Sequence, residues 1–129
     1  MKLLKISDDK GSVAIILCLL FTALLGFTAY VIDIGLVYAE RIKLSNALDS
    51  AALAAILELP ENDEKVKMIA TDYLEKNNVA PNNTVITIGS DKKSIQMEGI
   101  KNVKHFFSPI IKIDSSNVNV TTKAIIGPA

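Results

Sequence analysis

The chain has 129 residues, with 14 Lys plus Arg against 14 Asp plus Glu, one Cys, one His and no Trp. This length suffices for about one small domain, and the balanced charge argues against nucleic-acid binding and against an acidic disordered tail. A single Cys excludes an internal disulfide and any Cys-cluster metal site, and a single His leaves no His pair for zinc. Half of the residues are apolar and the mean hydropathy is positive, which is unusual for a small soluble domain. The apolar residues are therefore expected in one concentrated segment.

An uncharged run from Gly11 to Ile32 is that segment. At about 1.5 Å per residue, a helix of this length spans about 30 Å, the hydrocarbon thickness of a bilayer. A buried core helix is one alternative, but it would be apolar all round in a chain with little else to cover it. A cleaved signal peptide is another, although its apolar core is about 7–15 residues long and ends in a small-x-small site, which this run lacks. We predict a short leader over residues 1–11 and a transmembrane helix over residues 12–32, with Cys18 as an apolar residue of the span.

The lysines around the span predict its orientation. The leader carries three lysines, whereas the first residues after the span carry only Arg41 and Lys43. Because Lys and Arg near a span favour the cytoplasmic side, we predict a cell-membrane protein with a cytoplasmic N-terminus. Residues 33–129 would then form an extracytoplasmic body.

The helical composition continues beyond the span without a proline until Pro60. Residues at helical spacing there form one alanine-rich apolar face: Leu44, Leu48, Ala51, Ala52, Ala55 and Leu59. Pro60 should end the helix, because the residue before a proline avoids the α region. We therefore predict one continuous helix over residues 12–59, of which residues 33–59 form an amphipathic extension. Its small side chains would let another surface approach closely.

Residues 60–129 begin with a second predicted helix. Asn62 or Asp63 can cap it, and it should end near Asn77. Its apolar residues repeat at i, i+3, i+4, i+7 and i+8, as on one face of a helix. They are Val66, Ile69, Ala70, Tyr73 and Leu74.

The remainder of this head shows strand patterns. Residues 84–89 are β-branched, and apolar and polar residues alternate around residues 95–98 and over residues 118–126. The apolar stretch 105–113 contains Pro109 and is interpreted as a short helix or an irregular packing segment. We predict an α+β fold in which the two helices cover a small antiparallel sheet of three or four strands.

Few residues suggest chemistry. Asp33 lies where the helix leaves the membrane, and a carboxylate at this depth is costly unless paired. It is either solvated by lipid head groups or contacts a partner subunit. Asn46 and Asp49 either cap and solvate the helix or contact the head or an assembly neighbour. His105 is expected to be structural. The sequence has no nucleophile elbow and no phosphate-binding glycine loop, so we predict no enzyme activity, no cofactor, no metal and no small-molecule substrate.

The N-terminal motifs resemble a known family. Gly11-Ser12 precedes the apolar run and Val31-Ile32-Asp33-Ile34-Gly35 ends it. Leu44-Ser45-Asn46-Ala47-Leu48-Asp49-Ser50-Ala51-Ala52-Leu53-Ala54 follows. Together they are similar to the N-terminal region of the TadE/TadG-like proteins of Flp (tight adherence) pilus assembly.

This resemblance implies a pilin-like, single-pass envelope protein that acts as a minor component or assembly factor of a Tad/Flp-type pilus or secretion system. Its implied partners are the lipid bilayer and other pilus-assembly or pilin-like subunits, bound through the long helix. The implied assembly contacts are Asp33, Gly35, Asn46, Asp49, Ala51 and Ala52. The alternative function is a membrane-tethered extracytoplasmic binding or sensor module that uses the same anchor.

One departure refines the resemblance. Processed type IV-like pilins carry a Glu at the fifth position after the cleaved Gly, and if cleavage followed Gly11 that position would be Ile16. The missing carboxylate brings the chain closer to TadG-like members and predicts an intact N-terminus.

Overall fold

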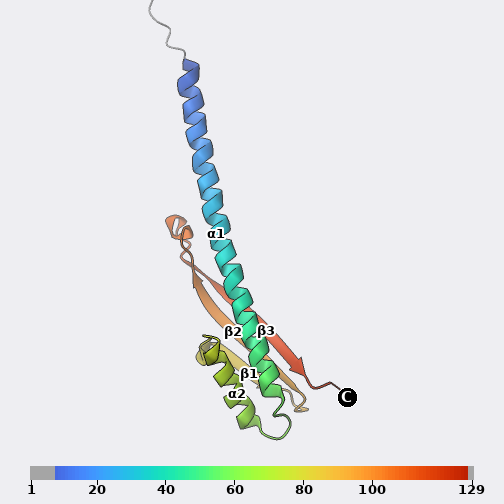
Figure 1. Ribbon diagram of the computed structural model, residues 1–129. Coiled ribbons are helices and arrows are strands. Elements are labelled where there is room, and N and C mark those ends of the chain that lie inside the picture. Colours follow the sequence, from blue (N-terminus) through green and yellow to red (C-terminus); the bar gives the residue numbers. More distant parts are fainter. Residues whose placement is uncertain (1–7, 128–129) are drawn as a thin grey trace, which may run out of the picture.

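A computed structural model describes residues 8–127 of the chain and begins with a long helix. This helix, α1 (Asp8–Ile56), is continuous through the apolar run and the alanine-rich stretch, as Figure 1 shows. It starts before the predicted Ser12, so part of the predicted leader is already helical. The first seven residues of that leader lie outside the described residues.

The end of α1 differs from the prediction by three residues. The helix ends at Ile56 rather than Leu59, and residues 57–61 form turns. Glu58 N donates to Ala55 O at 3.2 Å and Leu59 N to Ile56 O at 3.1 Å, the tighter hydrogen-bond pattern common at helix ends. Because Pro60 restricts the residue before it and has no N–H to donate, the regular helix stops about one turn earlier.

The second helix matches its sequence signals. Helix α2 (Asp63–Lys76) begins after Asn62, whose side-chain oxygen accepts a hydrogen bond from Lys65 N at 3.0 Å, and ends at Asn77. Asn62 therefore acts as the N-cap, satisfying an amide that has no partner within the helix. Its buried residues, Val66, Ala70 and Leu74, are spaced by four, and α2 lies beside the second half of α1.

Three antiparallel strands complete the head, in the order β1-β2-β3. They are β1 (Thr84–Ile88), β2 (Ser94–Lys104) and β3 (Ser115–Ile125), and β2 pairs with both neighbours. A short turn joins β1 to β2, whereas residues 105–114, with the 3-10 helix η2 (Ser108–Ile111), join β2 to β3. The predicted α+β class with a long first helix, a second helix and a small antiparallel sheet is confirmed.

The second half of α1 packs onto the inner face of this sheet. Leu44 and Leu48 of α1 are buried with Ile95 and Met97 of β2 in one apolar core. A Cβ atom on Gly99 would lie 3.1 Å from Cδ1 of both leucines. A larger residue at position 99 would therefore press against both leucines at this point of close approach.

The first half of α1 has no such cover. From Asp9 to Thr28 every residue is exposed, and Figure 1 shows this part extending beyond the head. Among the described residues, α1 is the one helix that is long and apolar enough to cross a membrane. The positive mean hydropathy of the chain therefore comes from a helix that its own head leaves uncovered.

Candidate functional site

The most polar buried position on α1 is Asp33, which is 1% exposed. Its carboxylate accepts hydrogen bonds from the backbone N–H groups of Phe106 at 2.8 Å, Phe107 at 3.2 Å and Ser108 at 2.6 Å. The Ser108 hydroxyl also donates to it. An ionised carboxylate has enough lone pairs to accept all of these bonds. We call this arrangement the Asp33 latch.

The Asp33 latch ties α1 to the connection between β2 and β3. The amides at the start of η2 have no partners within that helix, and one side chain on α1 satisfies them together. The sequence left two alternatives for Asp33, solvation by head groups or a contact with a partner subunit. In the structure the carboxylate is instead paired within its own chain. A contact of this position with a partner subunit stays a prediction.

A groove of about 440 Å³ opens beside the Asp33 latch. Tyr30, Tyr38 and Arg41 line it from α1, and His105 lines it from the β2–β3 connection. The Nε2 atom of His105 lies 2.9 Å from the Ser116 hydroxyl, so this histidine holds the start of β3 against the connection.

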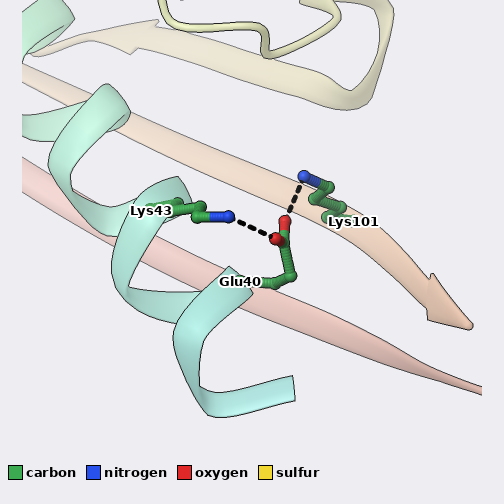
Figure 2. Close-up of polar contacts among 3 residues, drawn as sticks. All are labelled: Glu40, Lys43 and Lys101. Atoms are coloured by element: carbon green, nitrogen blue, oxygen red, sulfur yellow. Dashed lines mark hydrogen bonds and ion pairs between the residues drawn. The ribbon is translucent and has the colours of Figure 1, made fainter. Parts of the chain in front are cut away.

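A second polar link joins α1 to the sheet at Glu40. Figure 2 shows its carboxylate between two ammonium groups, Lys43 one turn later on α1 and Lys101 on β2. Lys43 Nζ lies 2.8 Å from Glu40 Oε1, and Lys101 bonds the other oxygen. Hydrogen bonds from Lys101 and Lys43 lower the pKa of Glu40 from 4.5 to about 2, against the opposite effect of burial.

Sequence analysis missed this link, although a signal for it exists. The residues of β2 that face the helix alternate, and Lys101 has the same parity as Ile95, Met97 and Val103. A lysine on the helix-facing side of a strand favours a carboxylate on the facing helix, because it is partly withdrawn from water. Glu40 on α1 provides that carboxylate.

The Glu40 link predicts a pH dependence. Because the pKa of Glu40 is lower in the folded chain than its ordinary value, its contribution to stability is complete above about pH 4.5 and is lost as the pH falls towards about 2. Glu40→Gln should lower the free energy of unfolding at neutral pH by about 1 kcal/mol, the scale for partly exposed ion pairs. The difference from the wild-type chain should shrink on acidification.

Denaturation of the detergent-solubilised chain at several pH values, followed by circular dichroism, measures this effect. Glu75→Gln on the exposed side of α2 is the matched control, because it removes a carboxylate without touching Lys43 or Lys101. A Glu40→Gln deficit that stays constant down to pH 2 would contradict the assignment.

The other candidate contacts fall into two groups. Gly35 and Asn46 are exposed, and so is Asp49, which accepts a hydrogen bond from the Thr122 hydroxyl on β3. Ala51 and Ala52 are 0% and 1% exposed in the core of the head. Within the single chain the two alanines therefore pack inside the head, and an assembly contact stays a prediction for all of these residues.

Within residues 8–127, no three His, Cys, Asp or Glu side chains are grouped so that they could hold a metal ion. The polar clusters around Asp33 and Glu40 instead connect α1 to the sheet. By these contacts the two clusters fix the position of the head along α1.

Asp33 and Glu40, the carboxylates of the two clusters, lie in a segment that is similar to a known protein family. Residues 11–58 match the family model described as Tad, putative Flp pilus-assembly TadE/G-like. The predicted resemblance is thus confirmed. The match does not distinguish TadE-like from TadG-like members. No curated protein and no solved structure matched the chain.

The TadE/G-like segment coincides with one structural element. It runs through almost all of α1 and stops just before Leu59, so α2 and the three strands lie outside it. Together, the match and the uncovered apolar helix fit a pilus-related protein with a membrane anchor and contacts to other pilus components.

Proposed function

We propose that this chain is a single-pass, pilin-like membrane protein that serves as a minor component or assembly factor of a Tad/Flp-type pilus or secretion system. One observation carries the proposal: the TadE/G-like segment is almost entirely one continuous helix, which is bare and apolar at one end and docked to a small head at the other. A helix of this kind can sit in lipid or among the helices of other subunits while the head stays at a fixed height.

The orientation is part of the proposal. The lysines of the leader favour a cytoplasmic N-terminus, which places the head outside the cytoplasm. The mechanism is mechanical: α1 holds the chain in the membrane, and the Asp33 latch and the Glu40 link pass force between α1 and the sheet.

Gly35 offers a test of assembly through α1. It is exposed, and a Cβ atom there would meet nothing within 4 Å, so a side chain at residue 35 begins in open space on the surface of α1. In cells that express the pilus system, the wild-type chain should be recovered from mild detergent together with a secretion ATPase or platform protein. Gly35→Phe should reduce that recovery several-fold at an unchanged membrane level.

Met68→Phe is the matched control, because Met68 is exposed on α2 and lies outside the TadE/G-like segment. This variant should retain the wild-type recovery. If the wild-type chain is instead recovered alone with a soluble ligand, the proposal fails in favour of the alternative, a membrane-tethered binding or sensor module.

A further inference from the structure

The connection between β2 and β3 is longer than its place in the sheet requires. Antiparallel neighbours can be joined by a two-residue turn, yet residues 105–114 separate these two strands. The connection carries five exposed large apolar side chains, of which Ile110 is 86% and Phe106 75% exposed. We call this set the apolar tip: Phe106, Phe107, Ile110, Ile111 and Ile113.

The apolar tip lies against the end of the predicted span. It shares a hollow of about 150 Å³ with α1, lined by Gly26 and Tyr30 on the helix and by Phe107 and Ile110 on the tip. Figure 1 shows the connection reaching along α1 beyond the rest of the head. From Gly26 to the end of the uncharged run at Ile32 the helix rises about 9 Å. The tip therefore overlaps the last turns of the segment that would be in lipid.

The Asp33 latch keeps the tip at this height. It binds Phe106, Phe107 and Ser108 through their backbone groups, which leaves the apolar side chains turned outward. A loop held by its backbone presents its side chains at a defined depth relative to α1.

The residues around the tip are those of a membrane interface. Lys104 precedes the tip, Lys112 lies between two of its isoleucines, and both lysines are exposed. Their charged ends can therefore reach water or lipid phosphates while their stems cover apolar surface. Tyr30 and Tyr38 on α1 are exposed at the same end of the span, where aromatic side chains concentrate in membrane proteins. A soluble head would gain nothing from such an exposed apolar cluster.

We propose that the apolar tip inserts into the lipid interface of the bilayer that α1 crosses, on the side of the head. This inference rests on the membrane anchor of the proposed function. The occupant is the phospholipid surface itself, because the tip lies alongside the span and continues its apolar surface. The second membrane contact holds the head against the bilayer and restricts the tilt of α1.

Site-specific labelling in lipid nanodiscs with one copy per disc tests this inference. A Cys18→Ala chain with Ile110→Cys carries an environment-sensitive dye on the tip. A matched chain carries the dye at Leu57→Cys, an exposed position in the turn that directly follows α1. The dye at residue 110 should be quenched by shallow brominated phosphatidylcholine, and its quenching constant with aqueous iodide should be several-fold smaller than at residue 57. Equal iodide quenching at both positions would overturn the inference.

A dye on native Cys18 tests the proposed membrane anchor independently of the tip. A dye on Cys18 reports whether α1 lies in lipid, because Cys18 is exposed in the apolar run. If that dye is not quenched by brominated lipid, the proposed anchor fails. If it is quenched while the dye at residue 110 is open to iodide, only the tip inference fails.

Two further variants test the geometry of the tip. Ile111→Asp should raise iodide quenching at residue 110 several-fold, whereas Ile100→Asp, on exposed β2 surface, should leave it unchanged. Protection at residue 110 that arises only with several copies per disc would overturn the inference and indicate a contact between subunits.

Discussion

Replacing Leu48 by Ala is expected to lower the free energy of unfolding of the head by about 2–5 kcal/mol, the usual cost of emptying a core leucine site. Leu48 is fully buried, and its side chain fills the space that Gly99 leaves open on β2. The close approach of helix and strand leaves little room for neighbours to collapse into the cavity. The loss should therefore exceed that of any exposed substitution on α1.

Chemical denaturation of the detergent-solubilised chain, monitored by circular dichroism, measures this loss. Leu57→Ala is the control, because Leu57 is 82% exposed and surface changes usually stay within about 0.5 kcal/mol. Equal stability of the two variants would mean that α1 is not docked on the sheet as described.

A pair of charges near the middle of the apolar run should remove the chain from the membrane. Leu20→Asp together with Phe21→Asp places two carboxylates near the centre of the span, each costing about 2.5–3.5 kcal/mol on an insertion scale. In the wild-type chain these residues are exposed and apolar. We expect the wild type to resist carbonate extraction and the double variant to appear in the soluble fraction.

The matched control places the same two charges at the other end of α1, one in its last turn and one in the turn that follows. Leu53 and Leu57 are exposed leucines beyond the predicted span, so the Leu53→Asp, Leu57→Asp chain should remain in the membrane pellet. Retention of both double variants in the pellet, or release of the wild type, would show that residues 12–32 are not the span.

Much of the fold could be predicted because its signals are local. The uncharged run, the apolar face from Leu44 onward and the Asn62 cap each lie within a few turns of chain. The alternation of apolar and polar residues in the strands likewise predicted that α1 packs on the sheet, because the apolar face of a sheet must be buried against another element. The ends of the elements shifted: α1 runs from Asp8 to Ile56, β2 continues to Lys104 and β3 already begins at Ser115. End positions depend on turn geometry and on pairing partners rather than on periodicity.

The candidate site was harder to predict because its contacts are distant in sequence. The sequence indicates that the Asp33 carboxylate is costly unless paired, but its donors lie 73 to 75 residues away. Glu40 was overlooked, since Lys101 is 61 residues distant and no local pattern joins the two. Ala51 and Ala52 are predicted assembly contacts, and only the tertiary structure shows that they lie in the core of the head.

The sequence by itself determined that the chain has a long helix with a bare apolar half, a second helix, a small antiparallel sheet and a TadE/G-like segment. These follow from hydrophobic periodicity, charge placement and motif spacing, which are properties of neighbouring residues. Only the tertiary structure decided which polar groups are paired, where α1 is covered and how far the β2–β3 connection reaches along it. The physical reason is that burial and hydrogen bonding depend on which distant segments meet, and here one face of α1 meets the sheet while Asp33 captures the connection.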